Sequence, residues 1–180
     1  NQSLQLPGAY PCIEAGDYPS LQAALDALPE DGGVVRLPPG VFEIHTPLVI
    51  QKGDVQIEGA GTATHIKNMN EEGLPAMILQ HPDKGENRDS ELWRISLLNF
   101  RITGNARSGH GIDARGINEI FLQGITVSYH GGDGILLYYC YEDPRVTNSL
   151  ITYNKGTGLN LIGCHDIVVS ANQFEENQDA

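Results

Sequence analysis

Six polar residues lie in or beside three short glycine-containing motifs, and together they could transfer a proton and hold an anion. The motifs are Gly111-Ile112-Asp113-Ala114, Gly134-Ile135-Leu136-Leu137 and Gly158-Leu159-Asn160-Leu161. The six polar residues are His110, Asp113, Arg115, Asp133, Tyr138 and Asn160. Removal of a proton next to a carboxylate requires a base, a proton donor and a positive charge. Histidine, tyrosine and arginine are suited to these tasks.

The spacing of the motifs indicates which of these side chains lie together. The glycines recur after 23 and 24 positions (111 to 134, 134 to 158). If Ile112 and Ala114 point into a core, Asp113 and Arg115 point outward, because side chains alternate along a strand. With neighbouring strands about 5 Å apart, Arg115 lies beside Tyr138. The residues before the glycines align as well, which places His110 within reach of Asp133.

This arrangement suggests a role for each residue. We expect His110, held by Asp133, to act as a base, Arg115 to stabilise negative charge and Tyr138 to donate a proton. Asp113, Asn160 and Lys155 are the candidate substrate-binding residues. The same pattern also fits outward polar residues of a β-solenoid that do no more than face water, and the sequence leaves this alternative open.

The elements that position these residues follow a solenoid pattern. Pairs of apolar residues such as Phe100/Ile102 and Ile125/Val127 alternate with polar neighbours between the motifs. A period in the low twenties with about three short strands per repeat is typical of a solenoid. Leucine-rich repeats share this period, but their fixed leucine ladder is missing here. We therefore predict one all-β solenoid domain over residues 1–180.

The N-terminal part differs from the repeats. Leu21, Ala24, Leu25 and Leu28 recur at helical spacing, which predicts an amphipathic helix over 17–28 that caps the solenoid. Short alternating runs follow between residues 33 and 57. The segment 68–91 is less regular and is expected to be a loop-rich excursion from the scaffold.

Three segments of the N-terminal part resemble the entry of the pectate-lyase-like β-helix superfamily. They are Gly16-Asp17-Tyr18-Pro19-Ser20-Leu21-Gln22-Ala23-Ala24-Leu25, Gly33-Val34-Val35-Arg36-Leu37-Pro38-Pro39-Gly40-Val41-Phe42 and Val55-Gln56-Ile57-Glu58-Gly59-Ala60-Gly61. The resemblance implies a right-handed parallel β-helix with an N-terminal capping helix. The superfamily includes lyases, hydrolases, epimerases and phage tailspikes, so fold alone does not decide activity.

The stretch from Ser108 to Arg115 is similar to two local motifs of that superfamily. Its Gly109-His110-Gly111 resembles the histidine motif of polygalacturonases. Its Gly-apolar-Asp pattern resembles the active-site strand of mannuronan epimerases, although Asp113-Ala114-Arg115 stands where those enzymes have Asp-Pro-His. The resemblance implies a polysaccharide as partner and an extracellular or periplasmic location.

Charge and cysteines limit the other partners. The formal net charge of -12 argues against nucleic acid and anionic membranes, because both require a basic face. Cys140 and Cys164 both follow their motif glycines by six positions and should stack as reduced thiols. No cluster of Cys and His has the spacing of a metal site, so we expect no metal and no cofactor, and the need for Ca²⁺ stays open.

Three functions remain in view. The leading hypothesis is a lyase or epimerase acting on a glycan that can contain uronic acids. The first alternative is a non-catalytic, carbohydrate-binding or structural β-helix. A glycoside hydrolase is the second, although Asp113 and Asp133 are expected about 11 Å apart, beyond the usual range of about 5–9.5 Å. We also expect the repeat to continue past Ala180, and an uncapped last turn to favour self-association.

Overall fold

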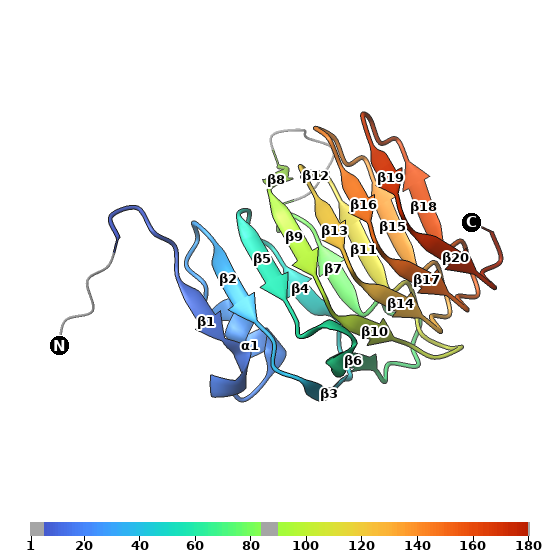
Figure 1. Ribbon diagram of the computed structural model, residues 1–180, viewed down its shortest axis with the longest axis horizontal. Coiled ribbons are helices and arrows are strands. Elements are labelled where there is room, and N and C mark those ends of the chain that lie inside the picture. The colour runs from blue at the N-terminus through green and yellow to red at the C-terminus, as the bar shows by residue number, and fades with distance from the viewer. Residues whose placement is uncertain (1–5, 84–89, 180) are drawn as a thin grey trace.

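The computed structural model describes residues 6–83 and 90–179 of the chain. Short strands stack into three parallel sheets that run along the long axis of the molecule, from the N-terminal end to the C-terminal end (Figure 1). Each complete turn of the chain adds one strand to each of the three sheets, which is the geometry of a parallel β-solenoid. The predicted all-β solenoid is therefore confirmed.

Sheet A has seven strands, and its inward side chains form a continuous apolar column. Val35, Ile57, Leu97, Leu122 and Val146 occupy equivalent positions and are almost completely buried. The column ends at Val169, which is 41% exposed in the last turn. In spatial order the strands are β1 (Cys12–Glu14), β2 (Gly33–Arg36), β5 (Val55–Glu58), β9 (Ile95–Leu98), β13 (Phe121–Gln123), β16 (Arg145–Thr147) and β19 (Val168–Ser170).

Sheet B follows sheet A in each turn after a sharp corner. One residue with positive φ makes the corner in four successive turns: Asn99, Gly124, Asn148 and Ala171. Asn and Gly tolerate this left-handed conformation, whereas it strains Ala171. The strands of sheet B are β3 (Gly40–Ile44), β6 (Thr64–Asn68), β10 (Arg101–Thr103), β14 (Thr126–Ser128), β17 (Leu150–Thr152) and β20 (Gln173–Glu175).

Sheet C carries the three glycine motifs. Ile112, Ile135 and Leu159 pair with one another and point into the core, as their spacing predicts. The strands are β4 (Leu48–Ile50), β7 (Met77–Leu79), β11 (Ile112–Arg115), β15 (Ile135–Tyr138) and β18 (Leu159–Ile162). A two-stranded sheet of β8 (Leu92–Trp93) and β12 (Ile117–Asn118) lies beyond the ends of these strands in the chain.

One short helix, α1 (Leu21–Asp26), closes the N-terminal end and follows the 3-10 turn η1 (Ala15–Asp17) (Figure 1). The Ser20 hydroxyl accepts a hydrogen bond from the Ala23 N–H at 3.1 Å and caps the helix. The amide of Gln22 accepts from the Val49 N–H at 2.8 Å and donates to the Val49 carbonyl at 3.1 Å. The Gln22 side chain thus forms the two hydrogen bonds with Val49 that a neighbouring strand would otherwise form at the edge of β4.

Two expected boundaries differ from the structure. The helix is shorter than 17–28, because Ser20 has extended backbone angles and helical geometry begins only after it. The segment 68–91 is not one excursion, since Met77 and Leu79 are buried in β7, which pairs with β4 and β11. The run Ala76-Met77-Ile78-Leu79 after Pro75 contains no polar residue, so it shows no strand alternation. Residues 84–89 of this segment lie outside the described residues.

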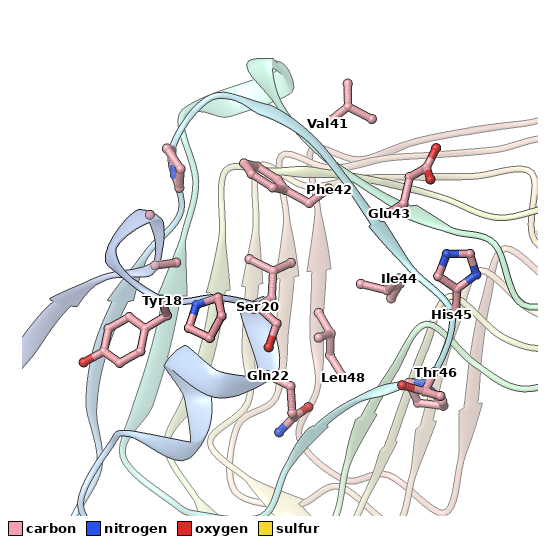
Figure 2. Close-up of a pocket in the computed structure, with 16 residues that line it drawn as sticks. Tyr18, Ser20, Gln22, Val41, Phe42, Glu43, Ile44, His45, Thr46 and Leu48 are labelled. Carbon is pink, nitrogen blue, oxygen red and sulfur yellow. The ribbon is translucent and has the colours of Figure 1, made fainter.

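A hollow of about 640 Å³ opens at the N-terminal end, between the helical segment and the chain from β3 to β4. Figure 2 shows Phe42, Ile44 and Leu48 around it, together with Tyr18 and Gln22 from the helical segment. It lies at the first strands of sheets B and C, whereas the glycine motifs lie in later turns. No helix of the described residues is long and apolar enough to cross a membrane.

Candidate functional site

The register predicted for the outward residues of sheet C is confirmed. Asp113 pairs with Leu136, which pairs with Asn160, and Arg115 pairs with Tyr138. Three successive turns therefore present these side chains on one face, which we call the sheet C face: His110, Asp113, Arg115, Asp133, Tyr138 and Asn160. Whether this face acts on a ligand stays a prediction.

His110 and Asp133 are neighbours, but the bond between them differs from the expected one. The His110 Nδ1 atom accepts a hydrogen bond from the backbone N–H of Asp133 at 2.9 Å, while the Asp133 Oδ2 atom lies 3.6 Å from it. A neutral imidazole that accepts at Nδ1 carries its proton on Nε2. In this geometry His110 can donate a hydrogen bond from Nε2 but has no free lone pair with which to act as a base.

The Asp133 carboxylate is engaged by the following turn. Its Oδ1 atom accepts from the Thr157 N–H at 2.9 Å, and its Oδ2 atom accepts from the Asn160 side-chain amide at 3.0 Å. The side chain is 14% exposed. Asp133 therefore ties two turns together and fixes the direction of the Asn160 amide.

Arg115 is held by two contacts. Its guanidinium donates to both carboxylate oxygens of Asp113, at 2.8 and 3.2 Å, and lies 5.1 Å from the centre of the Tyr138 ring. The hydrogen bond that Arg115 donates to Asp113 raises the pKa of Arg115 above its ordinary value, against the opposing effect of burial. Because two N–H groups of Arg115 are engaged, the remaining ones are available to a ligand.

Lys155 lies apart from this network. It is exposed on the turn before Gly158, and its backbone N–H donates to the His130 carbonyl at 2.9 Å. A charge at this position can attract an anionic ligand without taking part in the hydrogen bonds of the face.

His130 is a buried histidine, and only its alignment with residues of later turns indicates this burial in the sequence. It occupies the position of Asn154 and Asn177 in the next two turns, where each amide donates to a strand carbonyl one turn earlier. His130 is completely buried, and neither ring nitrogen has a well-aligned partner. Burial lowers its pKa to about 4, although a weak contact with the Ile102 carbonyl acts in the opposite direction.

The two cysteines behind the face stack as predicted and are free thiols. The Cys140 thiol is buried and the Cys164 thiol points to the Leu137 carbonyl at 3.3 Å. Their contact and burial raise the pKa of Cys140, and the hydrogen bond from Cys140 lowers the pKa of Cys164. No group of three or more His, Cys, Asp or Glu within residues 6–83 and 90–179 could hold a metal ion.

A second polar region, which we call the strand-end groove, lies beyond the ends of the sheet C strands. It is a hollow of about 300 Å³. Its lining residues come from four successive turns. They are Glu91 and Trp93, then Asn118, then Tyr141 and Glu142, and finally His165 and Asp166. Trp93 is 40% exposed.

Comparison with known proteins settles the family. The family model described as "Right handed beta helix region" matches residues 86–180, more than half of the chain. The chain belongs to the right-handed β-helix family. This confirms the predicted right-handed parallel β-helix. No curated protein sequence matches it.

Solved structures of other β-helix proteins are similar over most of the chain. The ORF18 protein of Geobacillus virus E2 has a TM-score of 0.83 and 18% identity, over 92% of this chain and 37% of that one. The chain thus spans little more than a third of the length of this relative. A pectin methylesterase mutant in complex with a hexasaccharide has a TM-score of 0.59 and 10% identity, over 94% of this chain and 67% of that one.

A further similar structure is the A-module of a mannuronan C-5 epimerase from Azotobacter vinelandii. Its TM-score is 0.51 and its identity 17%, over 91% of this chain and 56% of that one. At such identities these likenesses show the fold alone. Two of the three similar proteins act on polysaccharides by their names, and the third is a viral protein.

Proposed function

We propose that this β-helix binds an acidic polysaccharide along the sheet C face and acts on it by proton transfer, as a lyase or an epimerase. The observation that carries the proposal is a set of hydrogen-bond donors on successive turns of one face. These donors are His110 Nε2, the remaining N–H groups of Arg115 and the Tyr138 hydroxyl. Uronic acid carboxylates are acceptors that such donors recognise. The polysaccharide-acting relatives support a glycan as partner.

The geometry changes the roles that the sequence suggested. His110 has its Nδ1 lone pair occupied, so it would hold a carboxylate or hydroxyl oxygen through Nε2 rather than remove a proton. Tyr138 is then the group that transfers the proton. As its phenolate it would take the proton next to the uronate carboxylate, and as the phenol so formed it would give this proton to the glycosidic oxygen as that bond breaks in elimination. In epimerisation, water on the opposite face of the sugar would instead return a proton to the carbon. Arg115 lies beside its ring and supplies positive charge for the anion that forms.

The net charge of -12 opposes the approach of an anionic chain. At physiological ionic strength, however, the Debye length is about 8 Å, so exposed carboxylates beyond the face are largely screened. Within the face, Arg115 is the cationic side chain and neutralises Asp113, while Lys155 lies outside the face. The Asp133 carboxylate is bonded only by neutral N–H donors, so an acidic ligand would be held by the hydrogen-bond donors of the face rather than by an excess of positive charge.

The test is to incubate the protein with polyuronates and neutral polysaccharides. Elimination is followed by the ultraviolet absorbance of unsaturated products, and epimerisation by the NMR signals of the sugar ring. Tyr138→Phe keeps the ring beside Arg115 and removes the hydroxyl, so we expect loss of turnover with retained glycan binding. Tyr153→Phe is the matched control, because Tyr153 is exposed on another part of the surface. Full turnover by Tyr138→Phe would exclude the proposed role.

A non-catalytic glycan-binding module is the second candidate, and one observation favours it. Asp133 is engaged by Thr157 and Asn160, and Asp113 by Arg115, so both carboxylates of the face already have partners. This also weighs against a hydrolase, which uses two carboxylates for chemistry. Polyuronate binding that Arg115→Ala abolishes, with no product from any polysaccharide, would favour this candidate.

A further inference from the structure

The strand-end groove has the side chains of a sugar site and, unlike the sheet C face, has no Lys or Arg among its described lining residues. Trp93 is exposed at one end, Tyr141 is half-buried in the middle, and His165 lies 5.1 Å from Tyr141 between ring centres. Aromatic rings offer apolar faces on which sugar rings stack. Because the lining comes from four consecutive turns, it extends over about 14 Å, three strand spacings.

The groove carries carboxylates rather than cations. Glu91, Glu142 and Asp166 line it, and its described lining includes no Lys or Arg. The side-chain amide of Asn118, which is buried, donates to Glu91 at 2.8 Å and so holds this carboxylate in place. Carboxylates accept hydrogen bonds from hydroxyl groups and repel other carboxylates.

The nearest arginine does not change this balance. Arg94 lies 5.7 Å from the centre of the Trp93 ring, yet its guanidinium binds both oxygens of Asp54 and lies 3.7 Å from Glu119. Its charge is compensated by these two acids, and its contact with Trp93 restrains the indole ring. An anionic ligand would therefore meet no free cation here among the described residues.

From these observations we propose that the strand-end groove is a second glycan site, specific for uncharged sugar units. Trp93 stacks on a sugar ring, and Glu91 and Glu142 accept hydrogen bonds from its hydroxyl groups. The aromatic contacts from Tyr138 through Tyr139 to Tyr141, with ring centres 4.7 and 6.3 Å apart, connect the groove with the sheet C face. The inference goes beyond the proposed function and does not require that the sheet C face be catalytic.

Trp93 supplies a direct measurement, because it is the single tryptophan of the chain. Its fluorescence is titrated with neutral hexasaccharides of glucose, mannose, galactose and xylose, and with a hexagalacturonate of equal length. We expect at least one neutral hexasaccharide to change the emission in a saturable way, and the uronate to leave it unchanged. No response to any neutral hexasaccharide, or an equal response to the uronate, would overturn the proposal.

Substitutions distinguish sugar binding in the groove from binding elsewhere on the surface. By isothermal titration with the responding sugar, Trp93→Ala should weaken binding at least tenfold and Glu142→Gln several-fold. Glu30→Gln, an exposed acid on a distant N-terminal turn, should leave binding unchanged. Unchanged binding by both groove variants would also overturn the proposal. Tyr138→Phe should retain the Trp93 response, so failure of the sheet C activity and failure of the groove are distinguishable.

Discussion

The inside and the outside of sheet C follow different rules. Inside, Ile112, Ile135 and Leu159 repeat the same type of residue from turn to turn, because stacked turns give each of them the same surroundings. Outside, Asp113 is followed by Leu136 and then by Asn160. A residue type that repeats from turn to turn therefore indicates a core position of the fold. A residue type that changes from turn to turn indicates a position determined by local hydrogen bonds or by a ligand.

Substitutions inside and outside sheet C should differ most in their effect on the free energy of unfolding. Ile135→Ala removes a completely buried side chain from the middle of its column, and we expect a loss of about 2–5 kcal/mol from burial and the cavity left behind. Ile162→Ala is the matched outside substitution. Ile162 is 40% exposed, so its loss should be well below that of Ile135. Denaturant unfolding of both variants measures the contrast, and equal losses would mean that the inside and outside assignments are wrong.

The buried His130 should make the free energy of unfolding depend on pH. Its folded pKa is about 4, below the ordinary value of 6.5, so between these values the unfolded chain binds the extra proton. Stability should thus fall by about 3 kcal/mol as the pH drops from 6.5 to 4, and this contribution should not change further below pH 4. Unfolding free energies across this range give the slope.

The control for this slope is His130→Asn, which restores the residue type found at Asn154 and Asn177. Asparagine does not titrate, and its amide could donate to the Ile102 carbonyl as Asn154 does to Val127. We expect the difference in stability between wild type and variant to vary with pH only between about 4 and 6.5. A constant difference would show that His130 does not supply the slope.

Asp133 should be an exception to the rule that outside residues contribute little to stability. It lies on the outer face but forms hydrogen bonds that join two turns. Asp133→Asn places an amide where Oδ1 and Oδ2 accept from Thr157 and Asn160, so one donor loses its acceptor. We expect a loss of about 1–3 kcal/mol. Combining it with Asn160→Asp restores a donor opposite an acceptor, and the double variant should recover part of the loss in a thermal melt. Strict additivity would show that the bond contributes nothing.

The smallest effect concerns the two stacked thiols. Cys140 is buried with a raised pKa, whereas Cys164 is partly exposed with a lowered one. Since the thiolate is the reactive form, iodoacetamide at neutral pH should label Cys164 and spare Cys140 until the protein unfolds. Mass spectrometry of the labelled peptides checks the order, with the exposed Cys12 as an internal reference.

Much of the fold follows from the spacing of a few residues. The 23- and 24-residue steps between the motif glycines gave the pairing of Arg115 with Tyr138 and of His110 with Asp133, because a stacked solenoid converts sequence period into position. The strand β7 escaped prediction because Ala76-Met77-Ile78-Leu79 is apolar throughout and shows no alternation with polar residues. The helix was predicted too long because apolar spacing continues to Leu28, beyond the last residue of α1.

The site was less predictable, because it depends on which atoms bond. Neighbouring positions for His110 and Asp133 do not reveal that a backbone N–H, and not the carboxylate, binds the imidazole. The burial of His130 could have been inferred from its alignment with Asn154 and Asn177. The groove also left a signal, since Tyr141 and His165, like Glu142 and Asp166, are 24 positions apart.

The single-residue corners between sheets A and B give the outer surface of the later turns a regular spacing. These four turns form this corner in the same way, so outer side chains at equivalent positions in them are separated by whole multiples of about 4.8 Å. Duplication of one turn between Asn118 and Tyr141 would lengthen the groove by one such increment and leave each core column continuous. A β-helix of this kind can therefore match the length of its binding surface to that of a linear polymer in fixed steps, without redesign of its core.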